Sequence, residues 1–295
     1  MRPLCTGGIG EADASDPPPT GNGDQTFLHP IRARSTTEAS TIDEISVSGR
    51  PRSDFSARRL PAAPPLLGPG WNWIWAMKFV NFVKYADLEG IAAARQAHFA
   101  YADGLRARGE LAVGGPLLDV QGRRIGLLFV YEAASRAAAL LLARQDPFAL
   151  ANAIRSSELT EWRLRGARLD LLLEANRSAD RAAGDGPRTR LFANYAKYRA
   201  DRAGLATARP AHWKYDQTLE AAGRMALAGP FANDQGGLFV YSAASREDAL
   251  SFLEHDPFFA REVFAHYELL EWLIEGLNPD LLTSDFSAPA RARER

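Results

Sequence analysis

The sequence contains the same segment twice. "ARQAHFAY" at 94–101 returns as "ARPAHWKY" at 208–215, and the match aligns His98 with His212. Further pairs follow in the same order along the chain: "GGP" with "AGP", "LFVYEAASR" with "LFVYSAASR", "QDPF" with "HDPF", and "TEW" with "LEW". Matches spread over a whole unit in one order indicate a tandem duplication. The chain therefore has to fold as two similar units, 77–165 and 190–276.

Each copy has the pattern of a β-α-β-β-α-β unit. In the first copy we predict a strand at 78–85, a helix at 88–108, strands at 110–118 and 124–132, a helix at 135–145 and a closing strand near 158–164. Ser135 and Ser245 stand where the second long helix of each copy needs an N-cap. This order is typical of a ferredoxin-like sandwich, with both helices on one face of a four-stranded antiparallel sheet.

The strands are apolar on both faces. In "IGLLFVY" (125–131) apolar residues occupy successive positions, whereas a sheet with one face in water alternates. Helices cover one face, so something else has to cover the other. The sheet of the second copy, with "LFVY" at 238–241, is the nearest candidate. We therefore predict an α+β fold in which two ferredoxin-like units pack sheet to sheet as an intramolecular dimeric α+β barrel.

Two segments lack this patterning. Residues 1–76 are rich in proline and keep no helical or alternating period, so we expect a disordered N-terminal extension. Met77 directly precedes the first strand, and we hypothesise that translation in the cell begins there; an intact mass that includes Met1 would refute this. The polar segment 177–190 is interpreted as the linker between the copies.

Composition excludes several classes of function. A formal net charge of −1 argues against a nucleic-acid-binding protein, and no apolar run approaches the ~20 residues that a membrane span needs. The single cysteine favours a cytoplasmic location. Motifs for phosphate cradles, nucleophile elbows and HExxH metal sites are missing, so we expect no cofactor and no metal. The expected partner is a small molecule, bound by a monomer with a pseudo-dimeric core or by a higher homo-oligomer.

The repeated histidines are the first candidates for chemistry. His98 shares a helical stripe with Ile91, Ala94 and Tyr101, and His212 shares one with the matching residues of its own helix. Each imidazole should therefore lean toward the sheet. A buried histidine held by one hydrogen bond is the simpler interpretation, although its recurrence at matched positions favours a functional role.

Asp146 and Asp256 each precede a Pro-Phe pair. An aspartate followed by proline is a good N-cap and N1 combination, so a short helix at 147–154 or 257–264 is expected to begin there. A carboxylate has two oxygens, so one can cap the helix while the other accepts a hydrogen bond from a histidine N–H.

Two further pairs flank the histidines. Arg95 and Arg209 are either solvated helix charges or ligands for an anionic substrate group. Tyr101 and Tyr215 could donate a hydrogen bond to a substrate. The copies also differ near the histidines, since Ala102 aligns with Asp216, which leaves open whether both pockets work.

A helix-borne histidine, "GP" after the second strand and "DPF" after the second helix together resemble the YciI-like (YCII-related) family. The resemblance covers both copies and implies a dimeric α+β barrel of the kind also seen in muconolactone isomerases. It also implies an active site with His–Asp pairs, here His98 with Asp146 and His212 with Asp256. One relative is similar to a dehydrochlorinase that acts on a chlorinated hydroxyhydroquinone without a cofactor. Members are usually single units that form homodimers, so this chain departs by fusing two.

Three functions are compatible with these observations. The first is a cofactor-independent lyase or isomerase, for example of the dehydrochlorinase type, with the histidines as bases and the aspartates orienting them. The second is a non-catalytic small-molecule-binding or stress-response accessory protein on the same barrel. The third, an oxygen-using monooxygenase, has only fold analogy behind it.

Overall fold

The computed structural model describes residues 77–178, 189–200 and 202–282, all within one compact unit of the chain. The expected disordered extension at 1–76 and the middle of the expected linker, 179–188, lie outside the described residues.

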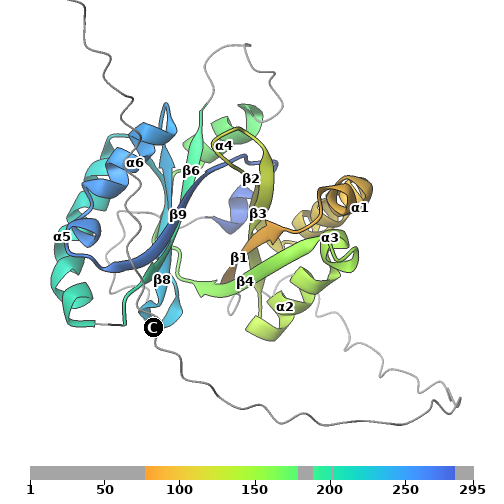
Figure 1. Cartoon of the computed structure of the whole chain (residues 1–295), viewed down its shortest axis with the longest axis horizontal. Coiled ribbons are helices and arrows are strands. Elements are labelled where there is room, and N and C mark those ends of the chain that lie inside the picture. Colours follow the sequence, from red (N-terminus) through yellow and green to blue (C-terminus); the bar gives the residue numbers. More distant parts are fainter. Residues whose placement is uncertain (1–76, 179–188, 201, 283–295) are drawn as a thin grey trace, which may run out of the picture. The chain divides into compact units, whose positions relative to one another are not determined.

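The first copy contains the predicted strands and helices. In chain order they are β1 Met77–Tyr85, α1 Leu88–Ala107, β2 Leu111–Leu118, β3 Arg124–Ala133, α2 Arg136–Gln145, α3 Pro147–Leu150 and β4 Ile154–Trp162. The strands pair in the antiparallel order β4-β1-β3-β2, which is the ferredoxin-like order. Figure 1 shows α1, α2 and α3 beside these strands.

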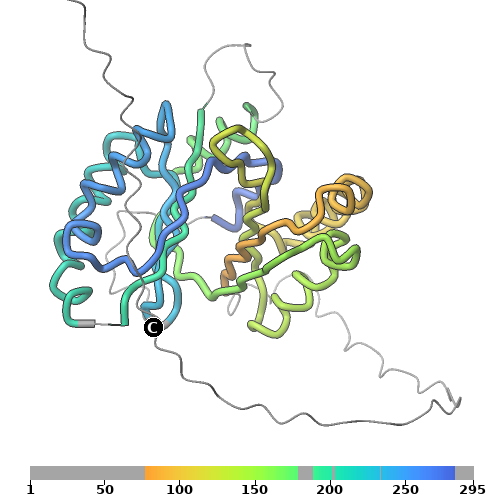
Figure 2. The backbone as a smooth tube through the Cα atoms, in the orientation of Figure 1, coloured from red at the N-terminus to blue at the C-terminus, as the bar shows by residue number. Residues whose placement is uncertain are grey.

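The second copy repeats this arrangement. Its elements are β6 Leu191–Tyr198, α5 Arg202–Ala221, β7 Met225–Pro230, η1 Ala232–Asp234, β8 Gly236–Ser242, α6 Arg246–Glu254, α7 Pro257–Ala260 and β9 Phe264–Trp272. The strand order β9-β6-β8-β7 matches that of the first copy. Figure 2 traces the chain through the two copies in turn.

The predicted N-caps of the second long helices are confirmed. Ser135 Oγ accepts from the Ala138 amide and Ser245 Oγ accepts from the Asp248 amide, each at 3.1 Å. Each bond satisfies one of the amides that a helix start leaves without an intrahelical partner.

Three predicted boundaries were wrong. The short helices end at Leu150 and Ala260, earlier than expected, because Asn152 and Glu262 adopt left-handed backbone angles that helices cannot continue through. The closing strand of the first copy begins at Ile154, four residues before the predicted start, because its N-terminal half is polar and gives no strand signal.

The two sheets pack face to face, as predicted. One buried cluster joins residues from both copies, including Val80, Phe82 and Val130 of the first and Tyr195 and Val240 of the second. The rings of Phe82 and Tyr195 stack at 4.5 Å between centroids. Two separate clusters fill the space between each sheet and its own helices. This packing explains why the strands are apolar on both faces, because helices cover one face of each sheet and the sheet of the other copy covers the opposite face.

The strands close into a barrel at two equivalent joints. At one joint β2 pairs with β9, where Leu117 lies opposite Trp272. At the other, an antiparallel bridge joins Trp162, the last residue of β4, to Phe231 after β7. The chain therefore forms the predicted intramolecular dimeric α+β barrel from two ferredoxin-like units.

The repeated "GP" and "EW" motifs form these joints. Trp272 Nε1 donates to the Gly115 carbonyl at 3.1 Å, and Trp162 Nε1 donates to the Gly229 carbonyl at 2.9 Å. A Cβ at either glycine would overlap a backbone carbonyl oxygen of the other copy, that of Leu273 at Gly115. Glycine is required at both positions because the two backbones approach too closely for any side chain.

Each copy also extends an arm onto the other. The first arm consists of β5 Gly166–Ala167, which pairs with β7, and α4 Leu169–Ser178. The second consists of β10 Gly276–Leu277, which pairs with β2, and η2 Pro279–Leu281. Helix α4 occupies the start of the segment expected to be a linker, so that expectation was wrong for residues 177 and 178. The arms bury apolar side chains such as Leu172 and Leu282 in the shared core.

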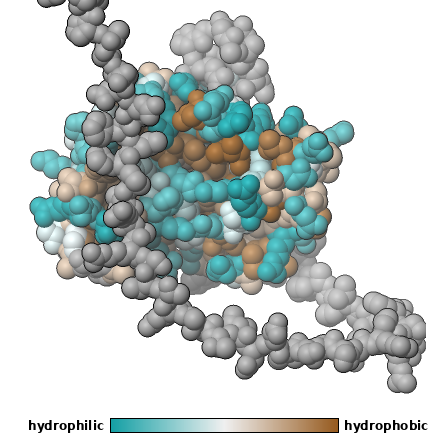
Figure 3. Space-filling model, in the orientation of Figure 1, coloured by the Kyte–Doolittle hydropathy of each residue, from teal (hydrophilic) through white to brown (hydrophobic). Residues whose placement is uncertain are grey.

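The surface drawn in Figure 3 mixes hydrophilic side chains with smaller groups of hydrophobic ones. No helix in the described ranges is both long enough and apolar enough to cross a membrane.

Candidate functional site

The first copy brings His98 and Asp146 together. His98 lies on the inner face of α1 and is 5% exposed, as the helical stripe predicted. Its Nδ1 lies 2.8 Å from Asp146 Oδ1, and the same oxygen accepts from the Phe148 amide at 2.9 Å. Asp146 therefore caps α3 and binds the imidazole with one oxygen, rather than with one oxygen for each role as we expected.

Aromatic rings fix the plane of this imidazole. The ring of Phe148 stacks on His98 at 3.9 Å between centroids and 12° between planes, and Phe129 lies beyond at 5.5 Å. The Pro-Phe pair after the aspartate thus serves two purposes: proline begins the short helix, and phenylalanine packs on the histidine.

His98 lines a cavity of about 740 Å³, a volume typical of small-molecule sites. Because Nδ1 is bound to Asp146, Nε2 is the nitrogen that remains, and it has no hydrogen-bond partner among the described residues. Phe99, Phe129 and Phe148 supply aromatic walls, and Phe99 is 43% exposed.

The cavity is positively charged. Its lining contains four arginines, Arg95, Arg106, Arg123 and Arg124, against the two carboxylates of Asp103 and Glu275. Arg106 pairs with Asp103, Arg123 with Asp119 outside the cavity, and Arg124 with Glu275 at 2.6 Å. Arg95 makes no ion pair with any residue in the described ranges, so its guanidinium is available to an anionic ligand.

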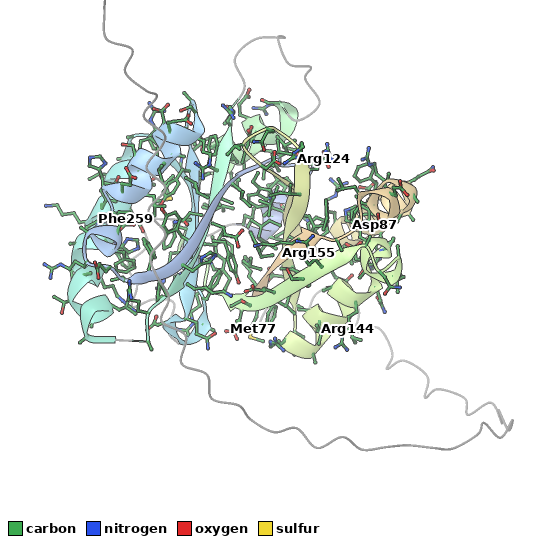
Figure 4. The ribbon with its side chains drawn as sticks, viewed as in Figure 1. Met77, Asp87, Arg124, Arg144, Arg155 and Phe259 are labelled. Atoms are coloured by element: carbon green, nitrogen blue, oxygen red, sulfur yellow. The ribbon has the colours of Figure 1, made fainter. Side chains whose placement is uncertain are left out.

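The second copy contributes to this first site. Glu275 and Gly276, which line the cavity, belong to the arm of the second copy that pairs with β2. Arg124, labelled in Figure 4 at the start of β3, holds this arm through its ion pair with Glu275. The first cavity is therefore complete only when both copies are in place.

In the second copy the imidazole lies between two carboxylates. His212 Nδ1 lies 2.8 Å and 2.9 Å from the oxygens of Asp256, and Phe258 stacks on the ring at 3.7 Å. Nε2, however, lies 3.3 Å from Asp216 Oδ2, one helical turn further along α5. The position of Asp216 is Ala102 in the first copy, so the nitrogen that faces the first cavity is occupied in the second.

The three groups change one another's protonation. Burial alone lowers the pKa of His212, but the carboxylates of Asp216 and Asp256 raise it above its usual value. Burial raises the pKa of Asp216 to about 7; the charge of Asp256 adds to this rise, and the charge of His212 opposes it.

Within the described residues, His212, Asp216 and Asp256 also form a group with metal-ligand atoms, all within 4.8 Å of one another. The two carboxylates contact different nitrogens of the ring, which point in divergent directions. A single ion cannot replace both contacts, so the geometry fits proton sharing better than metal binding.

Arg95 and Arg209 differ in the same way. Whereas Arg95 lines the first cavity, Arg209 pairs with Asp234 at 3.0 Å. The strand register aligns β3 of the first copy with β8 of the second, so that Arg124 and Asp234 occupy equivalent positions. The second copy therefore has an acidic residue where the first copy has a basic one.

The tyrosine hydroxyls have partners within the protein. Tyr101 donates to the Leu142 carbonyl and Tyr215 to the Phe252 carbonyl, each at 2.8 Å. Neither geometry favours the expected hydrogen bond to a substrate.

Sequence reasoning missed three contributors to these sites: Arg124, Glu275 and the role of Asp216. The first two come together from positions 151 residues apart, which no local pattern reveals. Asp216 did leave a signal, because an acid four residues after a helical histidine is placed to contact it.

Known proteins show the following similarities. A 5-chloro-2-hydroxyhydroquinone dehydrochlorinase from Burkholderia phenoliruptrix, solved in complex with 2,5-dihydroxybenzoquinone, is 27% identical, with a TM-score of 0.26, over 28% of this chain and 92% of its own. A mutant chlorite dismutase from Candidatus Nitrospira defluvii, in complex with cyanide, is 13% identical, with a TM-score of 0.43. The match covers 69% of this chain and 93% of the dismutase chain. No curated protein sequence matches the chain.

The YCII-related domain matches the chain twice, at residues 77–163 and 191–273. The two matches fall on the two barrel halves and include both His–Asp pairs. Together they span more than half of the sequence, and the chain belongs to the YCII-related family, carrying its domain in two fused copies.

Proposed function

We propose that the first copy is a cofactor-independent acid/base site in which His98 moves a proton of a small organic substrate. One observation supports this most strongly. The imidazole is bound to a carboxylate through Nδ1, while its other nitrogen remains available beside a cavity large enough for a ligand. An oriented histidine of this kind is the usual general base near neutral pH.

In the proposed reaction each group has one step. Asp146 accepts the Nδ1–H, which selects the tautomer with its lone pair on Nε2. Nε2 then removes a proton from the substrate, and Asp146 stabilises the imidazolium that forms. The proton returns to another atom in an isomerisation, or a leaving group departs with the bond electrons in an elimination. A positioned base contributes on the order of 10²–10⁴-fold, enough for a substrate proton that is already acidic.

The second copy is less suited to this chemistry. Asp216 contacts the nitrogen that would receive the proton, and both carboxylates favour the protonated imidazole. The roles of His212 as a base and Asp256 as its partner therefore remain predictions that this geometry does not favour.

Deuterium exchange tests the proposal whichever product the site forms. The full chain is incubated in D₂O with a panel of lactones, 2-oxo acids and chlorinated hydroquinones, and loss of acidic C–H signals is followed by proton NMR. We expect exchange or halide release with at least one compound. His98→Gln should reduce it by at least about 10²-fold, whereas His212→Gln should not.

Two outcomes would contradict the proposal. If compounds bind but none exchanges or reacts, the protein is a binder of small molecules. If His98→Gln retains full exchange, the base has been assigned wrongly.

A further inference from the structure

Comparing the copies position by position points to the chemistry of the ligand. We infer that the first cavity binds a small, flat organic anion whose acid group pairs with Arg95, and that Asp216 and Asp234 of the second copy stand in the places that such a ligand fills in the first. This inference rests on the function proposed for the same site.

The two imidazoles have matching partners at Nδ1 but not at Nε2. Both histidines bind an aspartate through Nδ1 and stack on a phenylalanine, so the two rings are placed alike. They differ at Nε2. A carboxylate oxygen of Asp216 lies 3.3 Å from the second ring, whereas alanine at position 102 brings no acid group to the first. The second copy thus shows that this nitrogen can be approached by an anionic oxygen.

An arginine lies three residues before each histidine on the same helix. Arg209 is neutralised by Asp234. Arg95 has no such partner in the described ranges. The position that matches Asp234 is Arg124 in the first copy, and Arg124 is itself paired with Glu275. The first copy therefore lacks counterparts of the Asp216 and Asp234 carboxylates. The two residues that such carboxylates would contact, His98 and Arg95, both border the cavity.

Arg95 and His98 lie close together beside aromatic rings, which limits the ligand they can share. Residues three apart on a helix are neighbours on its surface, with Cβ atoms about 5–6 Å from each other, so one small molecule can reach Arg95 and His98 together. The walls around this space are the rings of Phe99, Phe129 and Phe148, which suit a flat ligand. Arg95, whose guanidinium has no ion-pair partner in the described ranges, favours a negative charge on the ligand.

Equilibrium binding tests this assignment independently of turnover. The probes are benzoate, 4-hydroxybenzoate and cinnamate, each compared with its neutral carboxamide by titration calorimetry on the full chain. We expect the acids to bind with one site per chain and the amides to bind at least about tenfold more weakly. Arg95→Gln should weaken acid binding by at least about tenfold, the scale of one charge-assisted hydrogen bond, and leave the amides unchanged.

The second copy supplies the matched control. Arg209→Gln should not change acid binding, because that arginine is already paired. Ala102→Asp should abolish acid binding by placing a carboxylate beside His98, while Ala102→Asn should reduce it less. If Ala102→Asp unfolds the protein, the Arg95→Gln variant alone tests the inference, because an exposed arginine can be replaced without loss of the fold.

Three results would overturn the inference: no acid binds at millimolar concentration, acids and amides bind equally, or Arg209→Gln weakens binding as much as Arg95→Gln. Failure of the proposed function is a different result, since acids would then bind through Arg95 without exchange or turnover.

Discussion

At the scale of single residues, Asp146 shows how one side chain can serve both the fold and the site. Its Oδ1 accepts from the Phe148 amide and lies within hydrogen-bond distance of His98 Nδ1. Loss of function in an alanine variant would therefore not reveal which contact matters. An amide side chain separates the effect of the charge from that of the hydrogen bonds, because it keeps an accepting oxygen and removes the charge.

We expect Asp146→Ala to lower the free energy of unfolding by about 2–5 kcal/mol, the sum of a lost N-cap and an unpaired buried imidazole N–H. Asp146→Asn should lose less than half of that but should still slow proton exchange strongly, because the imidazolium is no longer stabilised. Urea unfolding and deuterium exchange measure the two effects. Equal stability losses in both variants would show that the charge itself holds the fold.

Asp216 should make stability depend on pH. Its pKa of about 7 in the folded protein lies above the usual 3.8, so the folded state holds more protons between those values. Stability should therefore fall as pH rises through this window, by at most about 1.4 kcal/mol per pH unit for one proton. His212 acts in the same direction, because its pKa is also raised and its contribution is lost as pH rises through that value.

The comparison variant is Asp216→Asn. Its unfolding free energy, measured in urea from pH 4 to pH 8, should change less with pH than that of the parent chain. The other charged groups facing the cluster, Asp256 and Arg209, are present in both proteins. A parent profile that rises with pH over the same range would contradict the assignment.

The sequence revealed the candidate residues of the first site but not the difference between the sites. Helical spacing placed His98 and His212 toward the sheet, and the Asp-Pro pairs marked the short helices that carry their partners. Spacing could not reveal that Asp216 contacts His212 and that Asp234 pairs with Arg209 in the second site. Those contacts depend on side-chain positions that only the packed structure defines.

At the scale of elements, the joints between the copies leave no room for a larger side chain. Gly115 and Gly229 each let a strand of the other copy approach within backbone contact, and a tryptophan from that strand donates to the glycine carbonyl. These contacts explain why "GP" and "EW" recur in the sequence.

Gly115→Ala should destabilise the protein by at least about 3 kcal/mol, because the added Cβ overlaps the Leu273 carbonyl and neither backbone can move without breaking the joint. Gly204→Ala in α5 is the control: nothing lies within 4 Å of its added Cβ, and alanine favours a helix by about 1 kcal/mol. Thermal unfolding of both variants measures the difference. A mild effect at Gly115 would mean that the joint is looser than its contacts indicate.

Most of the long strands and helices of the repeated unit could be predicted from their period. Helix α4, Leu169–Ser178, lies after that unit and was not predicted. The two-residue strands at Gly166–Ala167 and Gly276–Leu277 were not predicted either, because a strand of two residues has no period to detect. Their place in the sheet depends entirely on the other copy.

At the scale of the whole molecule, the shared core makes each copy depend on the other. Residues of both sheets form one cluster, and ion pairs join the copies at Lys84–Glu268 and Lys197–Glu158. A single copy would expose the apolar face of its sheet to water, which costs about 25 cal/mol per Å².

We therefore expect a fragment of residues 77–178 to form dimers or aggregates rather than stable monomers. Size-exclusion chromatography with light scattering measures this, and the full chain serves as the reference. A monomeric fragment with native-like unfolding would show that the sheet face is stable without its partner.

Linking the halves covalently also has a genetic consequence. In an assembly of identical subunits, every codon change alters both sites at once, so neither can be given up while the other is kept. In this chain Ala102 and Asp216 are equivalent positions encoded by separate codons, and so are Arg124 and Asp234. The second half can therefore carry Asp216 and Asp234, which contact its own arginine and histidine, where the first half has Ala102 and Arg124 beside a cavity.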